Sequence, residues 1–180
     1  MSILDGGFAA WQAQPGFPIE TRINPPSPKI FTVTLDENLI ASGTDADAAS
    51  KSGRGALLDA RPASFFAGKE KAPAAKAYGH IPGALNLDSA TFYDSAGNRL
   101  RPKAELAAIA ATVPSGPVAS YCNTGHWAAT NWFVLSELLG RKEVRLYDGS
   151  MAEWTADERR PVASSRTRWD DVKKALGLGS

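Results

Sequence analysis

Residues 117–129 read PVASYCNTGHWAA, and this stretch predicts one complete strand–loop–helix unit. An apolar, strand-like run leads to Cys122, the only cysteine of the chain. A short loop with one glycine, Gly125, follows it, and the next segment is typical of a helix. A thiol between the end of a strand and the start of a helix is favoured as a thiolate, because backbone N–H groups and the helix dipole stabilise negative charge there.

Strand-like and helical segments alternate along the rest of the chain. Strands are expected at residues 30–33, 56–60, 84–87, 117–121 and 143–147. Helices or single helical turns are expected at residues 35–41, 62–68, 102–112, 128–139 and 167–176. This alternation predicts an α/β fold with a mainly parallel central sheet. Sites in such sheets form at the carboxyl ends of the strands, which is where Cys122 falls.

The composition excludes several classes of partner. Twenty basic and nineteen acidic residues leave a net charge of +1, so no overall field attracts the chain to nucleic acid or lipid. No run approaches the roughly 18 apolar residues of a membrane span. Asp5, Gly6 and Gly7 interrupt any secretory signal after Met1, which leaves the compartment open and favours the cytoplasm. One cysteine and two histidines offer little for a metal site, and we expect no metal and no other cofactor.

A lone cysteine is more often a small buried hydrophobe than a catalyst, and its neighbours decide between the two. The next three residues are Asn123, Thr124 and Gly125. This composition is unfavourable for a packed strand and is typical of a loop whose backbone amides point inward. Gly125 also permits a positive φ and a close backbone approach. A ring of N–H donors around Cys122 would stabilise a thiolate, and equally a persulfide anion formed on it.

Three further motifs accompany this loop. LDAR at residues 58–61 follows an expected strand, GHIPGA at residues 79–84 precedes Cys122 by some forty residues, and an Asp-Gly turn followed by Trp154 ends the pattern. Together with Cys-x-x-Gly, and in this order, the motifs resemble a rhodanese domain over about residues 30–165. The resemblance implies a three-layer α/β fold in which helices flank a mainly parallel sheet.

The resemblance also implies a reaction, namely sulfur transfer of the thiosulfate or 3-mercaptopyruvate sulfurtransferase type. Cys122 would attack the sulfur of a small anionic donor, hold it as a persulfide, and pass it to a thiol or cyanide acceptor. No metal or organic cofactor is implied.

Carried over residue by residue, the resemblance makes Cys122 the catalytic residue. It implies a substrate-binding set made of Asn123, Thr124, Gly125, His126, Trp127, Arg61 and Phe65. Asp59 and His80 are expected to support the site. The Asp59–Arg61 motif either forms an ion pair at the sheet edge or lends positive potential to the pocket. His80 is expected to make a structural hydrogen bond, whereas His126 lies at the rim or contacts substrate.

Two departures from the family pattern concern the donor. The loop after Cys122 offers only His126 where thiosulfate-using members place cations, and it ends with Trp127. Phe65 stands where two-domain members often carry an arginine. Because a dianionic donor needs compensating charge when it leaves water, these residues favour a less charged or bulkier donor. Compensation from Lys69, Lys71 or Lys76 is the alternative.

The two ends of the domain share a local repeat. Residues 3–11, ILDGGFAAW, parallel residues 146–154, LYDGSMAEW, at an offset of 143 that also pairs Pro18 with Pro161. A repeat unit of roughly 140 residues would be a domain rather than a solenoid module. The chain is therefore expected to divide into a remnant of a preceding rhodanese-like domain (1–20), a proline-rich linker (21–29), the rhodanese domain (30–165) and a C-terminal helical tail (166–180).

The remnant carries apolar side chains that belong to another core, among them Ile3, Phe8 and Trp11. They are expected to dock on the following domain or to contact a second copy of the chain, which would make a homo-oligomer.

Two rival functions remain. A phosphatase with a cysteine nucleophile needs an arginine that clamps the phosphoryl oxygens, and no arginine lies between Cys122 and Leu139. A catalytically weak rhodanese-like binding or regulatory module is the stronger alternative.

Overall fold

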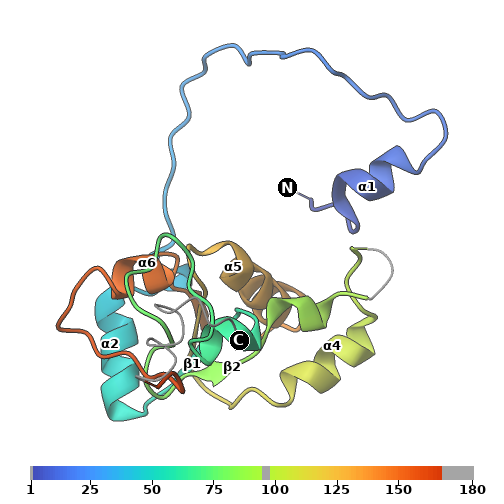
Figure 1. Cartoon of the computed structure of the whole chain (residues 1–180). Coiled ribbons are helices and arrows are strands. Elements are labelled where there is room, and N and C mark those ends of the chain that lie inside the picture. The colour runs from blue at the N-terminus through green and yellow to red at the C-terminus, as the bar shows by residue number, and fades with distance from the viewer. Residues whose placement is uncertain (1, 95–97, 168–180) are drawn as a thin grey trace, which may run out of the picture.

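The computed structural model describes residues 2–94 and 98–167, and its centre is a parallel sheet (Figure 1). Its strands are Ala56–Asp59 (β1), Leu85–Asn86 (β2), Val118–Tyr121 (β3) and Val144–Leu146 (β4). The strand order is β2-β1-β3-β4, and every pair is parallel. After β1 the chain forms β2 on one side of β1 and then β3 on its other side. The strands β1 and β3 therefore end side by side in the middle of the sheet. The predicted α/β fold with a parallel sheet is confirmed.

Helices cover both faces of this sheet. The α-helices are Gly7–Gln12 (α1), Gly43–Ser52 (α2), Ala63–Phe66 (α3), Lys103–Ala110 (α4), His126–Trp132 (α5) and Ser150–Trp154 (α6). A π-helix, Phe133–Leu138 (η3), continues α5, and the 3₁₀ turns are Glu37–Leu39 (η1) and Ser89–Phe92 (η2).

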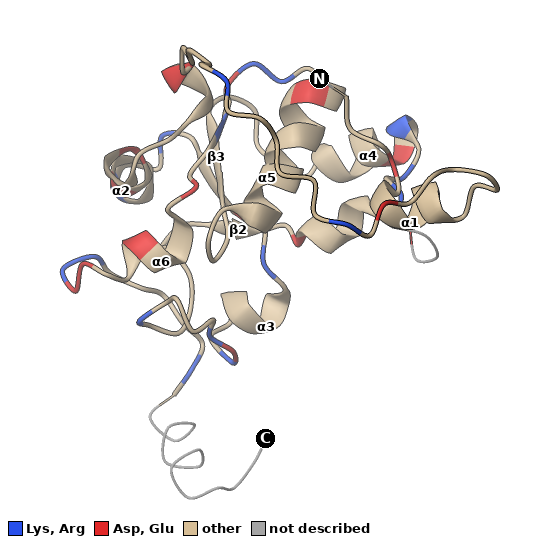
Figure 2. Ribbon diagram, turned by 90° about the horizontal axis from the view of Figure 1, so that it is seen from above, with Lys and Arg blue, Asp and Glu red and all other residues tan. Residues whose placement is uncertain are grey.

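Alternating side chains of the strands divide the core in two. Leu57 and Tyr121 pack toward α2 and α6, and Trp154 of α6 belongs to this cluster. Leu58 and Val118 pack on the other face, toward α4 and η3. Figure 2 shows the two helical layers on opposite sides of β3. This arrangement follows from the period of two in a strand, which sends successive apolar side chains to opposite faces.

Two expectations for the segment before the sheet are wrong. Residues 30–33 form no strand; Ile30 is fully exposed there, because no neighbouring strand offers backbone partners to this segment. The helix expected at residues 35–41 is only the turn η1, which Asp36 caps by accepting a hydrogen bond from the Asn38 N–H.

The sequence analysis also misses one helix and misplaces the boundaries of others, among them the helix after Cys122. Helix α2 was not predicted, although its capping box, Ser42 with Asp45, is visible in the sequence. The helix expected at residues 128–139 begins at His126 and changes to π geometry in its second half. The closing helix expected at residues 167–176 lies outside the described residues from position 168 onward.

The N-terminal repeat, residues 3–18, shares a helical turn and a tryptophan hydrogen bond with the end of the domain. The indole N–H of Trp11 donates to the Pro18 carbonyl at 2.9 Å, and that of Trp154 donates to the Pro161 carbonyl, also at 2.9 Å. Figure 1 shows α1 set apart from the body of the molecule, to which residues 13–40 connect it in a long arc. Its polar contact with the body is the Leu100 N–H, which donates to Asp5 Oδ1 at 2.9 Å.

Basic and acidic residues are scattered along the ribbon and are not gathered in one segment (Figure 2). Among the residues described, no helix has the length and apolar character needed to cross a bilayer.

Candidate active site

Cys122 directly follows β3, at the edge where the carboxyl ends of β1 and β3 meet. The register pairs Asp59 with Tyr121, so the residues that follow both strands converge on one point. Cys122 is 1% exposed and packs against Ala60 and Ala128. Such burial is compatible with a packed, inert thiol as well as with a shielded nucleophile, and the polar groups around the loop decide between them.

Six successive backbone N–H groups, those of residues 123–128, have no hydrogen-bond acceptor in the described part of the chain. Those of residues 126–128 belong to the first turn of α5, whose N–H groups have no partner within the helix. Gly125 makes this tight entry into α5 with a φ of +89°, and a Cβ there would lie 3.0 Å from the Asp148 carbonyl oxygen. The loop is therefore rich in free donors, as the sequence predicted.

Helix α6 holds the opposite side of the loop. The Met151 N–H donates to the Cys122 carbonyl at 3.1 Å, and the Ala152 N–H donates to the Asn123 carbonyl at 3.0 Å. The Cys122 N–H donates to the hydroxyl of Ser150 at 3.0 Å. Sequence reasoning missed Ser150, although the repeat gave a signal: glycine stands at the matching position, Gly7.

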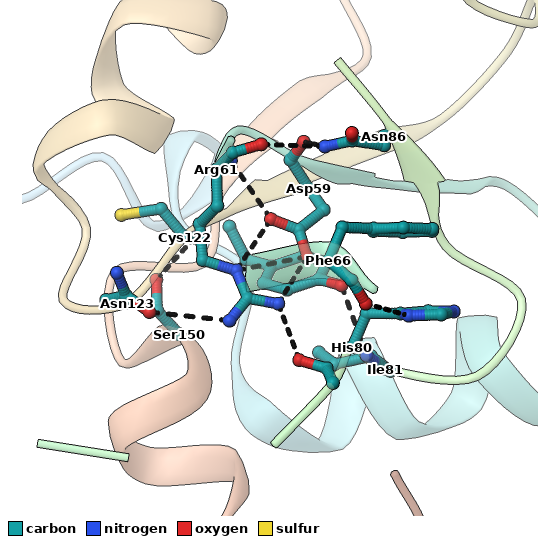
Figure 3. A network of polar contacts seen from close by, with 11 residues as sticks. Asp59, Arg61, Phe66, His80, Ile81, Asn86, Cys122, Asn123 and Ser150 are labelled. Atoms are coloured by element: carbon teal, nitrogen blue, oxygen red, sulfur yellow. Dashed lines mark hydrogen bonds and ion pairs between the residues drawn. The ribbon is translucent and has the colours of Figure 1, made fainter. Parts of the chain in front are cut away.

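Arg61 lies buried behind the loop and forms the centre of a polar network (Figure 3). Its guanidinium donates to both carboxylate oxygens of Asp59, with a closest distance of 2.6 Å, and to the Gly79 carbonyl at 2.7 Å. Burial alone would lower the pKa of Arg61, but the hydrogen bonds and negative charge of Asp59 outweigh it and leave that pKa raised. The ion-pair alternative for this motif is therefore the one that the geometry supports.

The same guanidinium reaches the loop after Cys122 through Asn123. Arg61 Nη1 donates to Asn123 Oδ1 at 3.4 Å. Because an arginine has no acceptor, this contact fixes the amide with its oxygen toward Arg61 and its NH₂ group on the other side. Figure 3 shows the Cys122 sulfur turned away from the guanidinium.

His80 and Tyr121 lock the turn that carries the second motif. The expected structural hydrogen bond of His80 is present: its Nδ1–H donates to the Phe66 carbonyl at 2.7 Å, and its ring stacks on that of Phe66 at 3.7 Å. Tyr121 accepts the Ile81 N–H at 3.1 Å. Burial raises the pKa of Tyr121 well above its ordinary value, so its hydroxyl remains a neutral partner.

The rim of the site is aromatic and polar. Phe65 of α3 meets Trp127 of α5 edge to face, with ring centroids 6.1 Å apart. Thr124 and His126 are exposed, and the threonine hydroxyl lies 3.2 Å from His126 Nδ1. The structure thus brings Phe65 into contact with Trp127, a residue at the start of α5 that lies 62 positions later in the chain. It places His126 at the rim of the site.

The lysines proposed as compensating charges are only partly available. Lys71 Nζ donates to the carbonyls of Ala72 and Ala75, so it stabilises its own loop. Lys69 and Lys76 are exposed. In the described part of the chain, no group of three His, Cys, Asp or Glu residues is arranged to hold a metal ion.

Comparisons with known proteins agree with this architecture. Residues 42–157 match the model of the rhodanese-like domain. The chain is 35% identical over 179 residues to a thiosulfate sulfurtransferase of Corynebacterium glutamicum, covering 94% of this chain and 59% of that protein. It is 37% identical over 168 residues to a probable 3-mercaptopyruvate sulfurtransferase of Pseudomonas aeruginosa, covering 90% and 57%.

Among solved structures, SseA of Escherichia coli, a 3-mercaptopyruvate sulfotransferase with the rhodanese fold, superimposes with a TM-score of 0.69 at 30% identity. That match covers 83% of this chain and 55% of SseA. The chain therefore spans a little over half the length of these relatives. Matching motifs, sheet order and sequence lead to one conclusion: the chain belongs to the rhodanese-like domain family.

Proposed function

We propose that this chain is a sulfurtransferase that carries a sulfane sulfur on Cys122. The observation that carries the proposal is the run of six unpaired N–H groups, residues 123–128, that begins directly after the thiol. Such donors stabilise the anions of the reaction, which are first a thiolate and then a persulfide. The sulfurtransferase names of two relatives support the same activity.

The reaction has two displacement steps. The Cys122 thiolate attacks the outer sulfur of thiosulfate, the S–S bond of the donor breaks, and sulfite leaves with the bonding electrons. With 3-mercaptopyruvate the C–S bond breaks instead, and the thiol proton ends on the carbon of the released pyruvate. A thiolate or cyanide acceptor then attacks the terminal sulfur, and the electron pair of the S–S bond returns to Cys122.

For the donor, we propose a molecule of lower charge than thiosulfate, such as 3-mercaptopyruvate. Residues 123–127 contain no Lys or Arg. Arg61 is already paired with Asp59, and Lys71 is held by backbone carbonyls. Amide groups of Asn123 and the loop therefore supply neutral donors, and Phe65 with Trp127 supplies an apolar rim.

A catalytically weak binding or regulatory module is the second candidate, and the near-complete burial of Cys122 is the observation that favours it. An inaccessible thiol cannot reach a donor unless the rim at Phe65 and Trp127 opens. Incubation with each donor followed by intact-mass measurement separates the two functions.

Under the proposal, the wild-type chain gains one sulfur atom, cyanide removes it, and Cys122→Ser gains none. In single-turnover experiments, the persulfide forms faster with 3-mercaptopyruvate than with thiosulfate. An unchanged mass with both donors would exclude the sulfurtransferase and leave the binding module. A preference for thiosulfate, with its KM unaffected in His126→Ala, would contradict only the donor assignment.

We also propose that residues 1–20 are the end of a preceding rhodanese-like unit, joined through residues 21–29 to the domain at 30–165, with a tail at 166–180. The matching Trp11–Pro18 and Trp154–Pro161 hydrogen bonds support a common origin of the two ends. Sequencing the genomic region upstream of Met1 tests it, since the proposal predicts codons for an in-frame rhodanese-like unit there.

A further inference from the structure

Ser150, the first residue of α6, has a backbone conformation that ordinarily selects glycine. Its φ is +52°, a left-handed value that crowds the Cβ of any L-residue against its own carbonyl. The matching residue of the N-terminal repeat is Gly7, with a φ of +56°. A left-handed φ thus occurs at both matching positions, once with the expected glycine and once with a strained serine that is completely buried.

The serine hydroxyl has a specific task at this position. It accepts the Cys122 N–H at 3.0 Å (Figure 3). It also donates to the Tyr147 carbonyl at 2.9 Å. Glycine could not make either contact. The adjacent Met151 N–H holds the Cys122 carbonyl at 3.1 Å. The peptide groups on both sides of the thiol-bearing carbon are therefore fixed by the start of α6.

We propose that Ser150 is a positioning residue for Cys122, and that its hydroxyl holds the Cys122 N–H on the α6 side so that the sulfur faces the free N–H groups of residues 123–128. Without the hydroxyl, the Cys122 N–H is buried and unpaired. The peptide then rotates to find another acceptor, and this rotation turns the sulfur away from the donors of the loop. The effect on sulfur transfer rests on the proposed function, but the orientation of the thiol does not.

Two variants separate positioning from stability. Ser150→Ala and Ser150→Gly both remove the hydroxyl, but only the alanine keeps a Cβ at φ +52°, so the glycine variant should be the more stable of the two. The readout is the rate at which iodoacetamide alkylates Cys122 as a function of pH, measured without any sulfur donor. We expect both variants to require a higher pH than wild type for half-maximal alkylation, by equal amounts despite their different stabilities.

Persulfide formation gives the second readout. A misplaced sulfur should lower the kcat of persulfide formation by roughly 10²-fold in both variants. The KM of the donor should change little, because the groups that bind the donor remain. The matched control is Thr155→Val. Its hydroxyl is also buried at α6 and donates to the Met151 carbonyl, yet it does not contact Cys122. This variant should lose stability and keep the wild-type alkylation profile.

The proposal is wrong if both variants alkylate with the wild-type pH profile, or if Ser150→Gly recovers wild-type reactivity in step with its stability. Either result would make Ser150 a purely structural residue. Failure of the sulfurtransferase proposal is distinguishable, because it would appear as an absence of persulfide in the wild-type chain while alkylation still reports the orientation of the thiol.

Discussion

Arg61 is the side chain on which most polar contacts behind the loop after Cys122 converge. It is 1% exposed and its partner Asp59 is completely buried, so each charge depends on the other for compensation. Through Asn123 the pair also supports the residue next to the thiol. The site thus has a buried ion pair, Asp59–Arg61, behind the loop, and uncharged backbone N–H donors in the loop itself.

We expect Asp59→Asn to lower the free energy of unfolding by about 3–5 kcal/mol, because it leaves the Arg61 charge buried without its counterion. Urea denaturation at pH 7 measures this loss. The control is Glu20→Gln, which removes the counterion of the exposed Arg22 and should leave the unfolding midpoint unchanged. Equal midpoints for wild type and Asp59→Asn would contradict a mutually dependent pair.

Among the elements, the start of α5 is constrained both by a left-handed backbone conformation and by a neighbouring stretch of backbone. Gly125 and Gly116 share a φ of +89°, but a Cβ at Gly116 meets nothing within 4 Å, whereas one at Gly125 meets the backbone of Asp148. The two glycines therefore separate the cost of the backbone conformation from the cost of a collision.

Gly116→Ala should lose about 1 kcal/mol of stability from the left-handed conformation alone. Gly125→Ala should lose roughly 1–3 kcal/mol more from overpacking against Asp148, and its persulfide formation should fall because α6 moves away from the loop. Thermal or urea unfolding of both variants measures the difference. Similar losses in the two variants would show that the loop relaxes without cost.

Helix α2 contributes a pH-dependent element. Hydrogen bonds from the Ser42 side chain and N–H lower the pKa of Asp45 below its ordinary value of 3.8. The ionised carboxylate therefore stabilises the folded state above pH 3.8, and this contribution disappears as the pH falls through the lower folded-state pKa.

Asp45→Asn should consequently cost about 0.5–1 kcal/mol at pH 7, a modest value because the carboxylate is partly exposed. The difference between wild type and variant should become smaller as the pH is lowered from 7 toward the folded-state pKa of Asp45, as urea unfolding at a neutral and an acidic pH will show. A difference that is the same at both values would mean that the charge of Asp45 is unimportant for the cap.

The molecule as a whole presents an apolar N-terminal repeat at its surface. Ile3 is 72% exposed and Phe8 is 62% exposed, and a groove of about 770 Å³ separates this repeat from α5 near His126. The hydrogen bond from the Leu100 N–H to the Asp5 carboxylate is a small contact for so much apolar surface. Such surfaces are usually covered in solution by another protein surface.

We expect the chain to self-associate through this repeat in a concentration-dependent way, and deletion of residues 1–22 to reduce the association. Sedimentation velocity over a range of concentrations measures it. Ile3→Ser combined with Phe8→Ser is the matched control, since it removes the apolar surface and keeps the length. A monomeric mass for all three proteins, together with an unchanged stability after the deletion, would contradict this role.

Local patterns in the chain suffice for much of this architecture. The apolar run before Cys122, the glycine at the loop and the helical segment after it predict the βα unit, because each depends on neighbours within a few residues. The Asp-x-Arg motif left two alternatives open, an ion pair at the sheet edge or positive potential for the pocket, and the structure shows the ion pair.

The features that local patterns could not predict are those that depend on partners distant in the chain. Residues 30–33 have strand-like composition but no strand pairs with them, and no property of those residues reveals the absence of a partner. Phe65 meets Trp127, and Ser150 meets Cys122, only after folding. The sequence alone predicted a candidate nucleophile and a loop of N–H donors directly after it, because both belong to one short segment. The tertiary structure decided which side chains surround and orient that thiol, because hydrogen bonding and packing at this site join segments that are 28 to 62 residues apart.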